Sequence, residues 1–243
     1  MYDTTSDRNS SHSATGSTLS YSASEMAPHA DWTDMNQTDH FVQIYESSDF
    51  IVRAVAEYVT YGIKSGETCI VVATPEHREG IKQLVTQFGA ELNTNDRYVA
   101  LDARETLDKF AVETLDQEMF DEVIGGLVSK AEKRGPVRIF CEMVAVLLAD
   151  GRPADALKLE DMWNKLREKH RFSLFCAYPT SELTRSGNHD FMAGVCGGHS
   201  KVIPDETYTS LLSEDRLKRI ALLQQRNRQL EAELAAYEAR ASA

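Results

Sequence analysis

Five short strand-like segments, separated by longer stretches with helical spacing, constrain the fold of this chain most strongly. The segments cover residues 41–45, 69–73, 98–101, 137–141 and 172–177. Segments 69–73 and 172–177 are continuous apolar runs, which are typical of strands covered on both faces of a sheet. Because strands that alternate with helices form βαβ units, the sequence predicts an α/β fold with a mainly parallel sheet flanked by helices.

The stretches between these strands carry apolar residues at helical spacing. A first helix is predicted to begin at Ser48 or Asp49 and to end near Gly62, and a second to begin at Pro75 and stop at Gly89. Further helical patterns cover residues 106–110, 116–133, 142–149 and 154–170.

The turn after residues 69–73 resembles a nucleotide-binding turn without its phosphate-binding groups. The motif G-x-x-x-x-G-K-[ST] holds phosphates with backbone N–H groups and a lysine. Here residues 74–77 read TPEH. Pro75 removes an N–H donor, and Glu76 is expected to put negative charge where a phosphate would lie. The pattern predicts a frame like that of an NTPase, used for something other than ATP hydrolysis.

Composition limits the partners and the compartment. The net charge of −12 disfavours direct binding to nucleic acid or to an anionic membrane. No apolar run approaches the roughly 20 residues of a membrane span, and the N-terminus has no secretory signal pattern. Three of the four cysteines lie in apolar runs and are interpreted as core residues, so a cytoplasmic location is expected.

The chain is expected to have three parts. Residues 1–38 are polar, lack apolar periodicity and are predicted to form a disordered tail. Residues 39–208 carry the strands and helices of the α/β domain. Residues 209–243 are predicted to form a C-terminal helix. Since ligands of parallel sheets bind beyond the carboxyl ends of the strands, we expect functional side chains just after the strands. They are Glu46, residues 74–77, Asp102, Glu142, Tyr178 and Pro179.

Several separated blocks resemble the MEDS domain family (methanogen/methylotroph, DcmR sensory domain). They are HFVQIY at residues 40–45, ATPEHR at 73–78, VRIFCEMVA at 137–145, LEDMWNKL at 159–166, FSLFCAYP at 172–179 and CGGHSKVIP at 196–204. The resemblance covers about residues 40–208. It implies a sensory domain related to the RecA- and KaiC-like ATPases, without the ATP-binding lysine and with no cofactor. The family is thought to sense small molecules, proposed to be hydrocarbon derivatives, and is often joined to DNA-binding or kinase modules. No such module is evident here.

Five polar residues are candidates for ligand binding or switching: His40, Tyr45, Glu142, Tyr178 and His199. His40 and Tyr45 lie five apart on a strand and are expected to point to opposite faces; they have either a structural role or a role in the pocket. A buried Glu142 needs a partner, which Arg138 on the same strand or a backbone group could supply, unless Glu142 contacts a ligand. For Tyr178 two interpretations stay open: it closes a pocket, or it is only part of a turn.

The segment 187–199 is interpreted as a mobile or closely packed loop, because it contains Gly194, Gly197 and Gly198. Cys196 and His199 have a spacing that could supply two zinc ligands, but no second Cys or His pair accompanies them. No metal site is therefore predicted, and no catalytic motif is found.

The C-terminal helix carries a heptad pattern. Its seam consists of Ile220, Asn227 and Leu234 at a positions, and Leu223, Leu230 and Tyr237 at d positions. Ile at a, Leu at d and one Asn at a favour a parallel two-stranded coiled coil. The alternative is an amphipathic helix folded back on its own domain. Asn227 favours the homodimer, because a buried asparagine pairs well across a dimer seam.

The sequence thus predicts a non-catalytic, cytoplasmic sensory protein. An unknown small molecule would alter a homodimer whose coil acts on a signalling partner, a kinase or a regulator. Two alternatives stay open: a protein-interaction scaffold that needs no ligand, and a residual nucleotide binder.

Overall fold

The structure is a computed structural model, and it describes residues 36, 38–92, 96–111, 113–186, 189–209 and 213–241. The predicted disordered tail, residues 1–38, lies outside the described residues apart from Asn36 and Thr38, and stays a prediction.

A six-stranded parallel sheet forms the centre of the domain, as the alternating pattern predicts. Its strands lie in the order β3-β2-β4-β5-β1-β6, and every neighbouring pair is parallel. The strands are β1 (His40–Tyr45), β2 (Thr68–Ala73), β3 (Tyr98–Asp102), β4 (Val137–Cys141), β5 (Phe172–Pro179) and β6 (Lys201–Ile203). The edge strand β6 is absent from the sequence prediction because it has only three residues and no apolar run.

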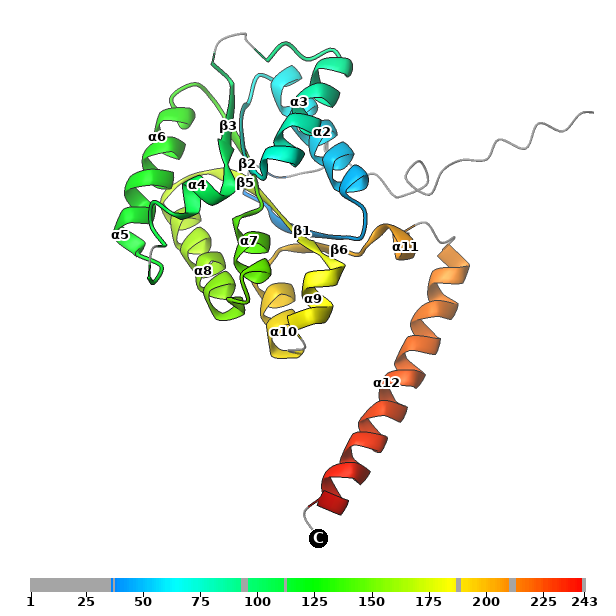
Figure 1. Cartoon of the computed structure of the whole chain (residues 1–243). Coiled ribbons are helices and arrows are strands. Elements are labelled where there is room, and N and C mark those ends of the chain that lie inside the picture. The colour runs from blue at the N-terminus through cyan, green and yellow to red at the C-terminus, as the bar shows by residue number, and fades with distance from the viewer. Residues whose placement is uncertain are drawn as a thin grey trace, which may run out of the picture.

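Helices cover both faces of the sheet (Figure 1). Helices α2 and α3 pack on one face, and α4, α5, η1, α6, α7, α8 and α10 contribute to the core on the other face. The bounds are α2 (Ser48–Lys64), α3 (Pro75–Gln87), α4 (Ala103–Leu107), α5 (Gln117–Phe120), the π-helical η1 (Asp121–Gly125), α6 (Gly126–Glu132), α7 (Met143–Ala149), α8 (Pro153–Lys169), α9 (Thr180–Ser186), α10 (His189–Gly198), α11 (Glu206–Thr209) and α12 (Ser213–Ala241).

Local chemistry explains where the first two of these helices begin. Ser47, rather than Ser48 or Asp49, is the N-cap of α2, and its side chain accepts a hydrogen bond from the N–H of Phe50. Pro75 occupies the first turn of α3, where its missing N–H costs no hydrogen bond.

Two local predictions were wrong. The part of segment 187–199 that the structure describes, residues 189–199, is not a loop: α10 occupies all but its last residue, because Phe191 and Val195, one helical turn apart, are buried against the core. Gly194 permits this packing, since a Cβ there would lie 3.1 Å from Leu157 of α8. The helix predicted at residues 106–110 instead begins at Ala103, because Asp102 caps it by accepting a hydrogen bond from the Glu105 N–H.

The C-terminal helix α12 projects away from the α/β domain (Figure 1). Its large apolar side chains are 38% to 71% exposed: Leu217, Ile220, Leu222, Leu223, Leu230, Leu234 and Tyr237. The helix is therefore not folded back on its own domain in this structure. Across the described ranges, no helix combines the length and the apolar character that a membrane crossing needs.

Candidate functional site

A pocket of about 190 Å³ opens at the carboxyl ends of four neighbouring strands. Its polar lining comes from Tyr45 after β1, Thr74 and His77 after β2, and Glu142 after β4, together with Glu182 of α9. In the strand order, β2 connects to β3 on one side of it, whereas β4 connects to β5 on the opposite side, so the two connections run in opposite directions across the sheet. The β2–β4 boundary is therefore the topological switch point at which parallel sheets bind ligands.

Glu142 is the central group of this pocket. Its side chain is buried, its Oε2 accepts a hydrogen bond of 2.9 Å from the backbone N–H of Thr74, and its Oε1 pairs with Nδ1 of His77. The carboxylate thus lies at the N-terminus of α3, where a nucleotide-binding protein would hold a phosphate. Glu76, which the sequence placed in that role, is exposed instead.

The predicted pairing of Glu142 with Arg138 was wrong. The Arg138 guanidinium pairs with Glu67 and lies over the rings of Tyr58 and Tyr61, with its central carbon 4.8 and 4.7 Å from the ring centroids. The reason is direction along the strand: Arg138 is at the amino-terminal end of β4, whereas Glu142 follows its carboxyl end.

Charge interactions alter the protonation of the pocket. Burial by itself would lower the pKa of His77, but the hydrogen bond and charge of Glu142, with the charge of Glu76, outweigh it and raise that pKa. Burial and the charges of Glu142 and Glu182 raise the pKa of the Tyr45 hydroxyl far above its usual range. The pocket therefore holds a His77–Glu142 pair that favours the protonated imidazole, beside a phenol that resists ionisation.

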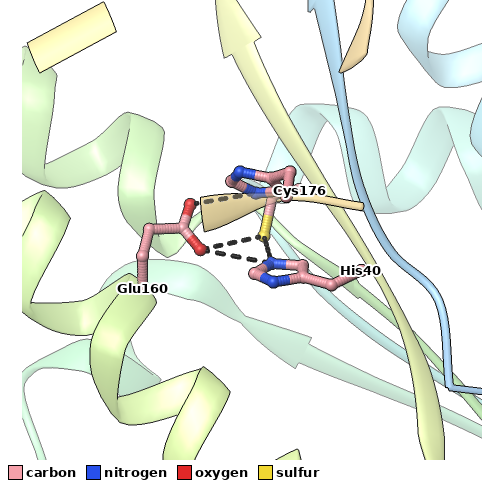
Figure 2. A group of neighbouring side chains, drawn as sticks. His40, Glu160 and Cys176 are labelled. Atoms are coloured by element: carbon pink, nitrogen blue, oxygen red, sulfur yellow. Dashed lines mark hydrogen bonds and ion pairs between the residues drawn. The ribbon is translucent and has the colours of Figure 1, made fainter. Parts of the chain in front are cut away.

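A second polar cluster is buried beneath the sheet, on the side covered by α8 (Figure 2). It consists of His40 of β1, Glu160 of α8, Cys176 of β5 and His199, which follows α10, and all four residues are buried. Figure 2 shows the side chains of His40, Glu160 and Cys176 converging on one point. The offered ligand atoms of all four residues lie within 4.8 Å of one another.

Neighbouring polar groups orient this cluster. Nδ1 of His40 lies 3.0 Å from Oδ1 of Asn164, and Nδ1 of His199 lies 2.6 Å from the carbonyl oxygen of Val195. The hydroxyl of Tyr178 donates to Oε1 of Glu160 over 2.7 Å. The first two contacts hold each histidine ring by the nitrogen that is not turned toward Glu160, and the third holds Oε1 of the carboxylate itself.

Burial dominates the titration of the cluster. It lowers the pKa of His199, and together with the charge of Glu160 it raises the pKa of the Cys176 thiol and of the Tyr178 hydroxyl well above their ordinary values. Burial alone would also raise the pKa of Glu160, but the contacts with His40, His199 and the Tyr178 hydroxyl outweigh it and lower that pKa. Glu160 is therefore a carboxylate.

The structure divides the five predicted site residues between two places. Tyr45 and Glu142 line the open pocket, while His40, Tyr178 and His199 surround Glu160. His40 and Tyr45 serve different faces of the sheet, as their odd spacing requires.

Sequence reasoning missed Glu160, Asn164 and the ligand-like position of Cys176. A detectable signal existed in α8, where Glu160 occupies the same helix face as the core residues Ala156 and Trp163. An acidic residue on an apolar helix face needs a buried partner. Cys196, which the sequence paired with His199, is exposed and takes no part in the cluster.

Comparison with known proteins identifies the family of the chain but no individual relative. A search among curated proteins finds no match to the chain. The sequence model of one family, described as MEDS, the MEthanogen/methylotroph, DcmR Sensory domain, matches residues 39–193. That match covers more than half of the chain and includes the pocket, His40, Glu160 and Cys176, and so this chain belongs to the MEDS family of sensory domains.

Proposed function

We propose that this chain is a non-catalytic sensory protein that binds a small molecule in the pocket between Tyr45, His77 and Glu142. The observation that carries the proposal is a pocket at the topological switch point of the sheet, lined by the buried His77–Glu142 pair. The chain that contains it belongs to a family of sensory domains. Perturbed titratable groups in a concave site are typical of functional sites.

The lining indicates the chemistry of the ligand. Part of the lining is apolar and consists of Ala145, Val146, Ala149 and Pro179, whereas the polar part carries two carboxylates, a phenol and the imidazole that pairs with Glu142. A volume of about 190 Å³ is below the ~300–1,000 Å³ of pockets for drug-sized molecules. We therefore expect a small, largely apolar compound with a hydrogen-bond donor or a positive charge, rather than a carboxylate or a phosphate.

A route from the pocket to the C-terminal helix supports a signalling role. Directly after Tyr45, the backbone N–H groups of Glu46 and Ser47 donate to the buried carboxylate of Glu206, over 3.0 and 2.6 Å. Glu206 begins α11, which leads to α12. A ligand that moves the end of β1 would change these two hydrogen bonds, and with them the position of α11, which precedes α12.

The proposed output is a homodimer formed through α12, which presents its signal to a partner protein, a kinase or a regulator. The exposed heptad seam supports this step, since Leu223, Leu230 and Leu234 have no covering on the described part of the chain. The proposed location is the cytoplasm, in keeping with four free cysteines.

Thermal unfolding with a panel of small ligands tests the pocket. Small alcohols and amines are expected to raise the melting temperature, and carboxylates are not. Ala149→Phe, which fills the pocket from an exposed position, is expected to abolish the shift, whereas Ala154→Phe on the exposed side of α8 retains it. Absence of a shift with every class would favour the scaffold without a ligand, and tight magnesium-dependent ATP binding would favour the residual nucleotide binder.

Light scattering tests the dimer separately. The full chain is expected to have twice the mass of one protomer, and Leu230→Glu at a d position is expected to reduce it to a monomer. Leu222→Glu is the matched control, because Leu222 is also exposed on α12 but lies outside the seam. A monomeric wild-type chain would contradict the proposed output.

A further inference from the structure

We propose that His40, Glu160, Cys176 and His199 form a buried binding site for one divalent transition-metal ion of the zinc class. The four residues come from β1, α8, β5 and the segment after α10, and they offer two imidazole nitrogens, a carboxylate oxygen and a thiol sulfur. This donor set suits Zn²⁺ and its relatives, whereas Mg²⁺ and Ca²⁺ prefer oxygen ligands alone. The site is distinct from the open pocket.

The distances among Nε2 of His40, Sγ of Cys176 and Oε2 of Glu160 fit a tetrahedral ion, whereas His199 approaches the other carboxylate oxygen, Oε1, with all four residues offering donor atoms within 4.8 Å of one another. Ligands at about 2.0–2.3 Å from a tetrahedral centre lie about 3.3–3.8 Å from one another. Nε2 of His40 lies 3.3 Å from Oε2 of Glu160 and 3.5 Å from Sγ of Cys176. Sγ of Cys176 lies 3.7 Å from Oε2 of Glu160, and Nε2 of His199 lies 3.5 Å from Oε1 of Glu160.

The hydrogen bonds around the cluster leave its nitrogen lone pairs directed inward. Arg167 Nη1 donates to Oδ1 of Asn164, which fixes this atom as the amide oxygen, so Nδ1 of His40 must carry the proton. The carbonyl of Val195 likewise requires a proton on Nδ1 of His199. Both rings therefore turn Nε2 toward the cluster, where it can act as a metal ligand, with the outer-shell partners that ligating histidines have.

One of these inward atoms has no hydrogen bond. Within the described ranges, Nε2 of His199 is buried and unpaired, although its ring is in contact with His40 at a centroid distance of 4.0 Å. Two imidazole lone pairs, a carboxylate and a thiol are served only by the thiol proton and by the Tyr178 hydroxyl that donates to Glu160, which is unfavourable away from water. A divalent cation would supply the missing positive charge. On binding, the cation displaces the proton of Cys176 to solvent, and the resulting thiolate and the Glu160 carboxylate together neutralise the two positive charges of the ion.

The ion would join parts of the domain that are distant in sequence. His199 is followed by Ser200, whose N–H donates to the carbonyl of His40 over 2.6 Å, and then by β6. Metal binding would thus hold the junction of α10 and β6 against β1, β5 and α8. We expect slower amide hydrogen exchange in β6 when the metal is bound.

Titration of untagged full-length protein with Zn²⁺ and Co²⁺, after treatment with a chelator, tests the proposal. Zn²⁺ is expected to raise the melting temperature with one ion bound per chain, and Co²⁺ to produce the absorption of a cobalt–thiolate bond. Cys176→Ser is expected to remove this absorption, while Cys196→Ser, which changes the exposed cysteine outside the cluster, retains it. Asn164→Leu, which removes the partner of His40, is expected to weaken Zn²⁺ binding by about 10- to 100-fold with the absorption still present at saturating Co²⁺.

Three outcomes would overturn the proposal: no cobalt–thiolate absorption in the wild-type protein, the same absorption in Cys176→Ser, or its loss in Cys196→Ser. The first of these does not depend on any variant that might fail to fold. The cluster would then be a hydrogen-bonded His–Glu network. Ala149→Phe is expected to bind Co²⁺ normally, which separates a failure of this site from a failure of the pocket.

Discussion

Replacement of Glu142 by glutamine tests whether the ion pair with His77 organises the pocket. The side chain of Glu142 is 2% exposed and that of His77 is 10% exposed, so water screens their interaction weakly. Glutamine keeps the size of the side chain and an oxygen that can accept from the Thr74 N–H. The variant therefore removes chiefly the charge that His77 contacts.

The expected loss depends on pH. His77 has a raised pKa in the folded protein, so its contribution to the free energy of unfolding is complete below the unfolded pKa of about 6.5. The contribution is lost as pH rises through the folded pKa. A hydrogen bond between charged groups contributes about 1.5–3 kcal/mol, and one between neutral groups about 1 kcal/mol. We expect Glu142→Gln to cost about 3 kcal/mol at pH 6 and about 1 kcal/mol at pH 9.

Urea unfolding at the two pH values, combined with NMR titration of His77, measures this difference. A cost of about 3 kcal/mol corresponds to roughly 6–12 °C in melting temperature for a domain of this size. Glu76→Gln is the matched control: Glu76 is exposed, and its loss is expected to cost less than about 0.5 kcal/mol. Equal losses at both pH values, or an unchanged pKa of His77 in Glu142→Gln, would refute the reasoning.

Four further substitutions test packing and hydrogen bonding elsewhere in the domain by urea unfolding. Gly62→Ala is expected to cost about 1–3 kcal/mol, because its Cβ would lie 2.6 Å from Sγ of Cys69; Gly126→Ala, a helical position with no atom within 4 Å, should instead stabilise by about 0.5–1 kcal/mol. Trp163→Ala, at a fully buried position, is expected to cost about 3–5 kcal/mol, and a loss below 1 kcal/mol would contradict its assignment to the core. Glu206→Gln is expected to cost about 1–2 kcal/mol by weakening the two hydrogen bonds at the start of α2, and an unchanged stability would argue against that contact.

The parallel α/β architecture could be predicted because each strand and helix carries its own local pattern. Residues 69–73 are apolar on both sides, and Pro75 starts a helix whatever surrounds it. Because the prediction used only local patterns, it missed two elements. Strand β6 is too short to carry a pattern, and the glycines of α10 concealed the helical periodicity of Phe191 and Val195. The C-terminal helix was predictable for the same reason, whereas its pairing with a second chain stays a prediction.

The residue types at the candidate site could also be predicted in part, because polar groups after buried strands lie at the ligand-binding edge of a parallel sheet. Tyr45 and Glu142 were found in this way. The partner of Glu142 could not be, since Arg138 and His77 are equally plausible cations in sequence, and only their positions along β4 and α3 separate them.

By itself the sequence determined the alternating elements, the loss of the phosphate-binding groups and the heptad seam, because these properties belong to contiguous residues. Only the tertiary structure decided which distant side chains meet. His40 and His199 are 159 positions apart, and they adjoin Glu160 and Cys176 because the strand order places β1 beside β5 and packs α8 and α10 over the same face. The strand order depends on the burial of all the apolar faces together, so no local pattern contains it.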